Sequence, residues 1–346
     1  MATYVQFESD DKVFSTERVY ASAWTNNINE LTAVYTSSTQ AVFTSPSSSG
    51  NFYIDVYNAD SSLSTSEVQY SVSYGHKAGS GSVDFSQGSG GEGYSATRTI
   101  YSQYRNLVFG GDETQNFTFN DYTPDDIYVI NINRARYKNA LRMGNLNLTL
   151  SGSTGKIYLT DDSITTSGSA TLRAGVGREF NLVSGSNGVR LGDNLTQVEG
   201  SGSYGKVYPD AGFIILNPAT LNAAVADGGI LLGTSTTSDS AERNNEKLVN
   251  AIDLGSSFIL DSQETISSRY YFCRVKNTQF NYTTNDSFTE SDGTLKYDSM
   301  TENPQVYITT VGLYNDNQDL VAVAKLSQPL PKNFTKEALI KVKLDY

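Results

Sequence analysis

The stretch PQVYITTVGLYNDNQDLVAVAKLSQPL, residues 304–330, decides the fold of the C-terminal part of this chain. Apolar and polar residues alternate on both sides of its centre, as they do in strands that bury one face. The polar run at 315–318 separates the two halves, and its Asn and Asp residues favour tight turns. The stretch therefore predicts a β-hairpin, with strands over 305–314 and 319–326.

The sequence KEALIKVKLDY at 336–346 predicts a closing strand after this hairpin. Side chains of a strand point alternately to its two faces, and here the two sets differ in polarity. The expected apolar face holds Ile340, Val342, Leu344 and Tyr346. The expected solvent face holds Lys341, Lys343 and Asp345. The end of the chain is therefore predicted to be a β-hairpin followed by one more strand.

Further strands are indicated upstream by alternating or continuous apolar runs bounded by turn residues. These runs are GNFYIDVYN (50–58), EVQYSVSYG (67–75), DIYVINI (126–132), NLNLTLSG (145–152), GKIYLTDDS (155–163), GREFNLVSG (177–185) and GFIILNP (212–218). Helices are predicted at fewer places. One helix follows Ser95 and stops at Gly110, since apolar residues recur there at helical spacing. Two more are expected, one after the Asn217 cap with Pro218 at its first position and one within 238–255.

Composition agrees with a chain of strands and tight turns. The 346 residues include 23 Tyr, 29 Gly and a single Trp, a mixture that suits half-exposed strands better than helix bundles. We predict a mainly β chain with a few short helices, a β-rich α+β fold in two or three domains. The expected domains are an N-terminal β-rich domain over 1–94 with a Gly/Ser-rich loop at 77–93, a central α+β domain over 95–260 and a C-terminal β domain over 261–346.

One basic stretch stands out in a chain whose net charge is -12. Four cations lie close together: Arg134, Arg136, Lys138 and Arg142. We refer to residues 134–142 as the basic segment. A short helix over these residues, capped by Asn133, would place Arg134, Lys138 and Arg142 on one stripe. Like charges at that spacing repel each other, so the stripe requires a compensating anion.

Two kinds of anion come into question for the basic segment. Nucleic acid is one, but the strong negative charge of the whole chain opposes its attraction. Carboxylates are the other, either on a partner subunit or within the chain, where the candidates are Asp125, Asp126, Asp161 and Asp162. We expect a structural or interfacial role, with Arg134, Arg136, Lys138 and Arg142 as the candidate interface residues and with no nucleic-acid partner.

No motif in the sequence marks a cofactor, a metal or a catalytic group. GSTGK at 152–156 lacks the glycine spacing of a phosphate loop, and NDNQDL at 315–320 lacks the later ligands of a calcium loop. His76 is the only histidine and Cys273 the only cysteine, so neither has a second residue of its kind. We therefore expect no cofactor and no enzyme. A hydrolase with paired carboxylates stays open, because Asp and Glu are numerous.

The chain shows no targeting or membrane-spanning segment. Its first residues, MATYVQFESDDK, lack a basic region followed by an apolar run. No stretch approaches the ~20 apolar residues that a membrane-spanning helix needs. We therefore expect no membrane span and assembly in a cytoplasm.

Several long stretches resemble virion structural proteins of tailed bacteriophages. They are TRTIYSQYRNLVF (97–109), DDIYVININRARYKNAL (125–141), YGKVYPDAGFIILNP (204–218), YYFCRVKNTQFNY (270–282) and the sequence from Asn303 to the end. The sequence is most similar to proteins of contractile-tailed phages of marine cyanobacteria. The likeness extends from about residue 95 to the end and is densest in the last 44 residues, 303–346. In addition, ITTVGLYN and LVAVAKL are similar to a hairpin in tail-fibre and baseplate proteins.

The resemblance implies a non-enzymatic structural component of a virion, in or attached to the tail baseplate. Its partners would be other tail or baseplate subunits in a symmetric oligomeric assembly, and its location the virion tail, assembled in the host cytoplasm. The alternatives are a host-receptor-binding or fibre-attachment protein, for which a host surface glycan would be the partner, and a tail-associated glycan hydrolase. A glycan-binding surface usually exposes aromatic platforms, and the single Trp24 argues against it.

Overall fold

The computed structural model describes residues 4–37, 53–81, 96–112, 114–153, 155–165, 170–191, 197–198, 202–236, 243–282 and 285–346. The fold is mainly β with a few short helices, so the predicted fold class is confirmed. The chain divides into two compact units. Unit 1 comprises Met1–Arg18 and Thr265–Tyr346, and unit 2 comprises Val19–Glu264. Most of the expected Gly/Ser-rich loop, residues 82–93, lies outside the described residues.

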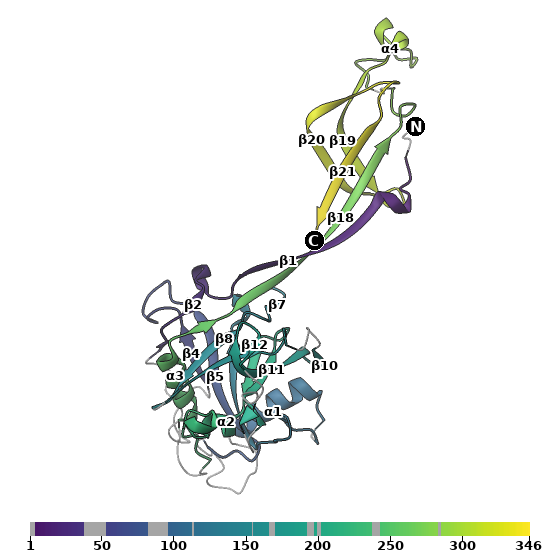
Figure 1. Ribbon diagram of the computed structural model, residues 1–346. Helices are drawn as coiled ribbons and strands as arrows, with labels where there is room; N and C mark the ends of the chain where they lie inside the picture. The colour runs from purple at the N-terminus through teal and green to yellow at the C-terminus, as the bar shows by residue number, and fades with distance from the viewer. Residues whose placement is uncertain are drawn as a thin grey trace, which may run out of the picture. The chain divides into compact units, whose positions relative to one another are not determined.

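Unit 2 is built on one large antiparallel sheet (Figure 1). Its strands follow in the order β2 (Glu30–Leu31), β17 (Phe258–Ile259), β8 (Asn147–Ser151), β9 (Lys156–Asp161), β11 (Gly177–Ser186), β15 (Gly205–Tyr208), β16 (Phe213–Leu216), β6 (Asp126–Ile132), β5 (Val68–His76), β4 (Tyr53–Tyr57) and β3 (Tyr35–Thr36). The short strands β10 (Thr171–Arg173) and β12 (Val189–Arg190) pair with β11, and β13 (Gln197–Val198) pairs with β14 (Gly202–Ser203). The apolar runs of the sequence thus became strands of a single sheet.

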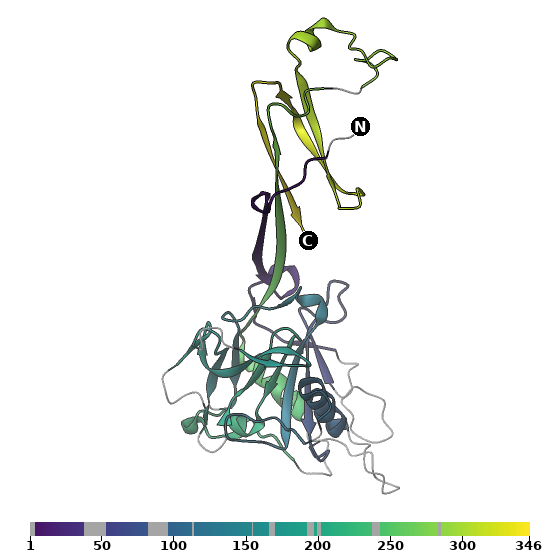
Figure 2. The same ribbon diagram turned by 90° about the vertical axis from the view of Figure 1, so that its right-hand side faces the viewer.

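The central strands of this sheet are buried on both faces. On one face, Ile130 and Ile214 pack in a core with Leu248 of α3 (Asn244–Gly255). On the other face, Val129 packs with Tyr101 of α1 (Ala96–Phe109). Figure 2 shows both helices beside the strands of unit 2. Because each face is covered, strands such as β6 and β16 read as continuous apolar runs and not as alternating ones.

Helix α1 confirms the prediction of a helix ending at Gly110, which has a positive φ of 68°. The expected cap Ser95 lies outside the described residues. The helix approaches β5 very closely at Gly75, where a Cβ atom would lie 2.8 Å from the backbone nitrogen of Tyr101. A glycine is therefore required at this crossing.

The two later helices also form where the sequence predicted them. Helix α2 (Pro218–Asn222) begins with proline at its first position, and the Asn217 side chain accepts a hydrogen bond from the backbone N–H of Ala219. Proline fits there because the first N–H groups of a helix have no partner within the helix. Helix α3 covers 244–255 of the predicted 238–255, and residues 237–242 lie outside the described part.

Unit 1 contains the predicted hairpin and closing strand. Strand β19 (Val306–Tyr314) pairs with β20 (Leu320–Lys332), which runs beyond the expected end at 326. A second sheet has the order β1 (Lys12–Ser22), β18 (Asp261–Val275) and β21 (Ala338–Asp345). Strands β1 and β18 continue along the chain from one unit into the other. The short helix α4 (Asp298–Glu302) lies between β18 and β19 in the sequence.

The turn of the hairpin is held by its own polar side chain. Asn315 accepts a hydrogen bond from the backbone N–H of Asp319 through its side-chain oxygen, at 2.8 Å. The backbone N–H of Gln318, with φ of 66°, donates to the carbonyl of Asn315 at 3.0 Å. The polar run therefore acts as a turn and not as part of a calcium loop.

The two units differ from the three expected domains in their boundaries. The expected boundary near 94 falls inside unit 2, because β5 and β6 on either side of it pair along their length. The division near 260 lies close to the observed one, Glu264/Thr265. The start of the chain belongs with the C-terminal part, an association between distant residues that no local pattern announces.

Candidate assembly interface

The basic segment does not form the predicted helix. Only η3 (Arg134–Arg136) is helical, as a single 3-10 turn, and the backbone then extends into β7 (Ala140–Leu141), which pairs with β18. The prediction of a helix over 134–142, and with it the single stripe of cations, is wrong. The cap was right, since the Asn133 side chain accepts from Ala135 N–H at 2.9 Å. The reason is tertiary: the backbone N–H of Arg142 donates to the carbonyl of Asp261 and not within a helix.

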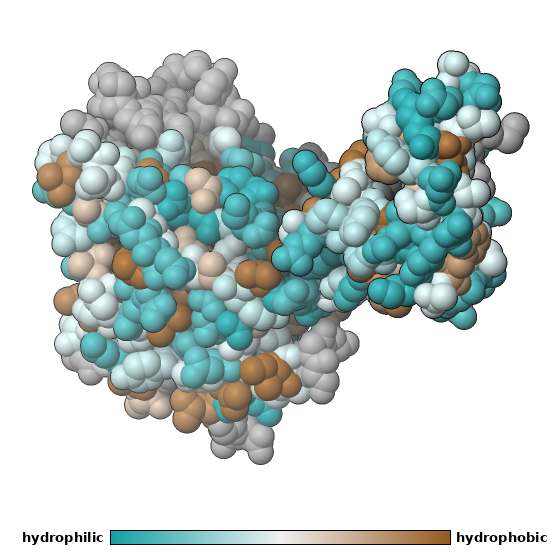
Figure 3. Space-filling model, turned by 90° about the horizontal axis from the view of Figure 1, so that it is seen from above, coloured by the Kyte–Doolittle hydropathy of each residue, from teal (hydrophilic) through white to brown (hydrophobic). Residues whose placement is uncertain are grey.

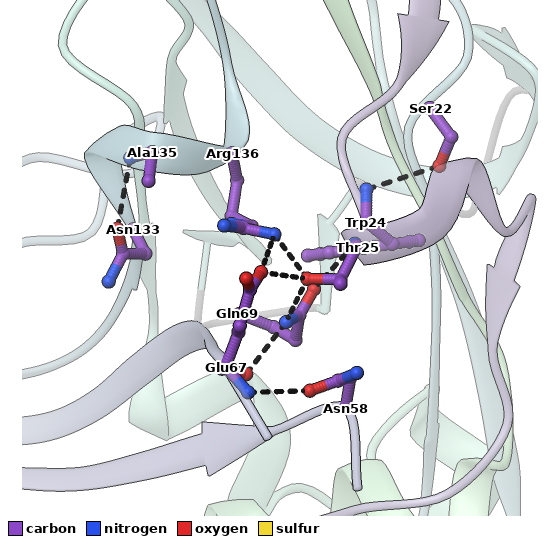
Figure 4. Close-up of polar contacts among 9 residues, drawn as sticks. All are labelled: Ser22, Trp24, Thr25, Asn58, Glu67, Gln69, Asn133, Ala135 and Arg136. Carbon is purple, nitrogen blue, oxygen red and sulfur yellow. Dashed lines mark hydrogen bonds and ion pairs between the residues drawn. The ribbon is translucent and has the colours of Figure 1, made fainter. Parts of the chain in front are cut away.

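Arg136 is held in a polar network within unit 2 (Figure 4). Its Nη1 lies 2.8 Å from Oε2 of Glu67 and also donates to the hydroxyl of Thr25. Gln69, fully buried, donates to that hydroxyl and accepts from the backbone N–H of Thr25. The Thr25 hydroxyl, and then the charge of Arg136, lowers the pKa of Glu67 below its usual value. Arg136 therefore neutralises the chain's own carboxylate.

The remaining cations of the basic segment lie apart from one another. Arg142 forms an ion pair with Asp261 at 2.9 Å and covers the ring of Tyr20 at 4.2 Å. Arg134 donates to the carbonyl of Tyr137 and lies over the ring of that residue. Lys138 is exposed.

Three of the four carboxylates that the sequence suggested for these cations have other partners. Asp161 accepts from the backbone of Gly144, Asp162 from Asn181, and Asp126 from Tyr74. The observed counter-ions, Glu67 and Asp261, lie far from the basic segment in sequence, so no spacing rule could select them. The basic segment thus serves mainly as an internal connection in unit 2.

Replacing Gln69 with leucine is expected to lower the free energy of unfolding of unit 2 by about 1–3 kcal/mol. The substitution leaves the Thr25 N–H and the Glu67 carbonyl, which Gln69 now bonds, without these partners in a half-buried place. Lys138→Gln, at an exposed position of the basic segment, should change the free energy of unfolding by less than about 0.5 kcal/mol. Urea unfolding, followed by the fluorescence of Trp24, measures both. Equal effects of the two substitutions would mean that Gln69 does not stabilise unit 2 through its bonds to Thr25 and Glu67.

A second polar network, centred on Glu179, was not predicted from the sequence. The Glu179 carboxylate is buried and accepts from both Nε and Nη2 of Arg173, from Nζ of Lys206 and from the hydroxyl of Tyr208, at 2.7–3.1 Å. Burial acts to raise the pKa of Glu179, but Arg173 and Lys206 together hold it below its usual value. Every partner of this carboxylate comes from the neighbouring strands β10 and β15. The network connects strands and holds its carboxylate charged.

The only histidine lies at the end of β5, in a cluster of ionisable groups. His76 pairs in register with Asp126, and its Nδ1 accepts from the backbone N–H of Ala78 at 3.0 Å. Burial lowers the pKa of His76, while the charge of Asp125 acts in the opposite direction. Burial raises the pKa of Asp126 to about 6, although the Tyr74 hydroxyl donates to it at 2.9 Å. His76 is therefore a buried residue of a strand and not part of a surface loop.

Asp126→Asn is expected to stabilise unit 2 by about 1–2 kcal/mol near pH 7.5, a value reduced for partial exposure of the group. The pKa of Asp126 is higher in the folded state than in the unfolded chain. Between about pH 6 and pH 4 the folded state therefore binds more protons than the unfolded chain does. The gain from the substitution should therefore shrink as the pH falls through about 6. The lowered pKa of His76 disfavours the folded state as the pH falls. This effect is present in both proteins, so it cancels when their free energies of unfolding are compared. Equal stabilities at neutral pH would contradict this assignment.

The remaining sequence candidates take structural places. Cys273 is half-buried on β18, and burial, with the charge of Asp11, raises the pKa of its thiol, which disfavours the reactive thiolate. Before β9, the backbone N–H of Gly152 donates to the carbonyl of Gly155. In the part of the chain that the structure describes, no group of three or more His, Cys, Asp or Glu residues is placed to hold a metal ion.

Unit 1 exposes large apolar side chains on a small core. Only Leu313, Ile340 and Val342 form its fully buried cluster among the described residues. On β20, Val321 and Val323 are 66% and 57% exposed. Further large apolar residues at the surface of this unit are Val13, Phe14, Tyr307, Tyr314, Leu320, Leu339 and Tyr346. Hydrophobic side chains lie among hydrophilic ones on the face shown in Figure 3. Where such side chains form a contiguous patch, the patch marks a site of contact with a protein, a membrane or a ligand.

Comparisons with protein-family models, with curated proteins and with solved structures give no match. Among the described helices, none combines the length and the apolar character needed to cross a membrane.

Proposed function

We propose that this chain is a non-enzymatic structural component of a tailed-phage virion, located in or attached to the tail baseplate. It acts through protein–protein contacts with other tail subunits, in a symmetric assembly formed in the host cytoplasm. The observation that carries the proposal is the exposed apolar surface of unit 1, where strand residues such as Val321 and Val323 face solvent. Burying each such side chain in an interface contributes on the order of 1 kcal/mol.

The family resemblance and the exposed surface coincide in the same unit. The stretch with the densest resemblance, from Asn303 to the end, contains β19, β20 and β21. These strands carry several of the exposed apolar residues of unit 1, including Leu320 and Leu339. A hairpin with apolar residues on its outer face suits docking onto another subunit better than it suits an isolated surface.

The polar networks around Glu179 and Arg136 in unit 2 support a structural role over catalysis. The buried carboxylate of Glu179 is surrounded by donors that keep it charged, and Arg136 is held by Glu67 and Thr25. Such groups connect strands and leave little freedom for proton transfer to a substrate. A hydrolase would instead hold two carboxylates on either side of a bound sugar.

The test is the position of the chain in intact particles. Cryo-EM density and crosslinking mass spectrometry of purified contractile-tailed particles should place it in the tail, with crosslinks from Lys341 and Lys343 of β21 to neighbouring subunits. The purified chain should neither cleave host envelope glycans nor bind them tightly. Absence from particles would contradict the proposal. A location only at a distal fibre tip, together with glycan binding, would favour the receptor-binding alternative.

A further inference from the structure

Strand β1 forms an open edge of its sheet. Within the described part of the chain it has one sheet partner, β18, which leaves its other edge without a strand. All its residues from Lys12 to Ala21 are exposed, and Phe14 is 61% exposed. A long exposed edge with apolar side chains is a template for pairing with another strand, and natural proteins usually blunt it.

Two-fold symmetry restricts how β1 can pair with β1 of a second copy. Opposed residues of an antiparallel pair lie on the same face, so a symmetric pair must be centred on a single residue that faces its own copy. A centre at Glu17 or at Arg18 places like charges directly opposite each other, which is unfavourable. A centre at Ser15 places Lys12 opposite Arg18, with the same result. A centre at Thr16 brings no like charges together and pairs the whole stretch from Lys12 to Tyr20. Centres at Phe14 or Val19 also avoid like charges, but they lie nearer the strand ends and pair fewer residues.

The register centred on Thr16 gives favourable partners on both faces of the strand. On one face, Phe14 lies opposite Arg18, so that the Phe14 ring meets a cation. Lys12 lies opposite Tyr20, whose ring already has Arg142 of its own chain over it. On the other face the opposed pairs are Val13 with Val19 and Ser15 with Glu17. Symmetry repeats each of these pairs, and Thr16 meets Thr16 at the centre, a pairing that strands favour.

The same sheet already uses cation–aromatic pairs across its strands. Tyr270 of β18 lies opposite Lys343 of β21, and Phe272 opposite Lys341. The Nζ atom of Lys341 lies 4.1 Å from the centre of the Tyr270 ring. The pairs expected between two β1 strands would extend this pattern across a new strand boundary.

We propose that β1 pairs edge to edge with β1 of a second copy of this chain, antiparallel and centred on Thr16. This inference specifies one contact of the proposed assembly role and rests on it. Joining one strand edge buries less than the roughly 1,600 Å² of a standard interface, so the dimer is weak and depends on concentration. A surrounding assembly would strengthen the contact, because it raises the effective concentration of the two strands.

Disulfide crosslinking tests the register directly. In a Cys273→Ala background of the full chain, Thr16→Cys places two thiols opposite each other, within the roughly 4.4–6.8 Å Cα separation of a disulfide. Val19→Cys, exposed on the same strand, serves as the matched control, because its two copies would lie six residues apart along the pair. Oxidation should give a covalent dimer with Cys at 16 and not with Cys at 19. The reverse result would overturn the register.

A charge exchange tests the pairs themselves. Phe14→Lys places Lys opposite Arg18 twice in each dimer, so sedimentation velocity should show a dissociation constant raised roughly tenfold or more. Adding Arg18→Glu replaces these repulsions by attractions and should restore the dissociation constant to within about threefold of the original. Circular dichroism confirms folding of each variant. An unchanged dissociation constant for Phe14→Lys, or failure of the double variant to recover, would overturn the proposal.

The two proposals fail in different ways. A chain that is monomeric at every concentration in solution, and that is crosslinked in particles through surfaces other than β1, overturns the dimer and keeps the virion role. A chain that forms the Thr16-centred dimer and is absent from particles overturns the virion role and keeps the dimer.

Discussion

Replacing Glu179 with glutamine is expected to lower the free energy of unfolding of unit 2 by about 2–4 kcal/mol. Glutamine fits the same space but carries no charge, so Arg173 and Lys206 lose their common counter-ion. The Lys206 side chain is only 12% exposed, and water replaces the lost interaction poorly there. Removing one partner of a buried ion pair is costly because it leaves an uncompensated charge. The value lies below that of a fully buried pair because Arg173 is partly exposed.

Glu246→Gln is the matched control for this prediction. Glu246 pairs with Arg243 at 3.3 Å in an exposed helical position, so its loss should change stability by less than about 0.5 kcal/mol. Urea unfolding of both variants, followed by Trp24 fluorescence, measures the difference. Similar small effects would mean that water reaches Glu179 in the folded protein.

The contribution of Glu179 to the free energy of unfolding should also depend on pH. Its folded-state pKa lies below the usual value, so its contribution is present above about pH 4.5 and is lost as the pH falls through the folded-state pKa. The difference between the parent chain and Glu179→Gln should therefore narrow in acid. Asp126→Asn shows the opposite sign at neutral pH, since burial disfavours the charged form of Asp126. The two carboxylates thus differ because Arg173 and Lys206 lie beside Glu179, whereas burial dominates at the partly exposed Asp126.

Replacing Phe258 with alanine is expected to have the largest effect on stability, a loss of about 3–5 kcal/mol. The Phe258 ring is 1% exposed and lies 4.9 Å from the Trp24 ring and 5.4 Å from the Tyr70 ring, centre to centre. Its backbone carbonyl accepts from the indole N–H of Trp24. Removal of the ring leaves a cavity among large rigid neighbours that cannot collapse to fill it.

Leu172→Ala is the control for Phe258→Ala, because Leu172 is 78% exposed in the same unit. This substitution should change the free energy of unfolding by less than about 0.5 kcal/mol. The fluorescence of Trp24 should also shift to longer wavelength in folded Phe258→Ala, as water reaches the indole. Unchanged emission with unchanged stability would contradict the central place of this aromatic cluster.

Strands and helix ends were predictable where a local pattern specifies them. The hairpin of β19 and β20 follows from alternation around Asn315, and α2 begins at Asn217 and Pro218 because cap chemistry is local. The prediction of a helix over the basic segment failed because the structure of this segment depends on residues far away in the sequence. Its spacing suits a helix, but bonds to β18 and to Asp261 outweigh that weak preference.

The sequence by itself determined the β-rich character of this chain, its C-terminal hairpin and the turn within that hairpin, because alternation and turn chemistry act between neighbouring residues. It also suggested carboxylates, within the chain or on a partner, as counter-ions of the basic segment, and within the chain Arg136 and Arg142 have such counter-ions. Only the tertiary structure decided which carboxylates these are, Glu67 and Asp261, and that Glu179 joins Arg173 and Lys206. The physical reason is that strand order in an antiparallel sheet brings distant residues together, and no local spacing encodes that order.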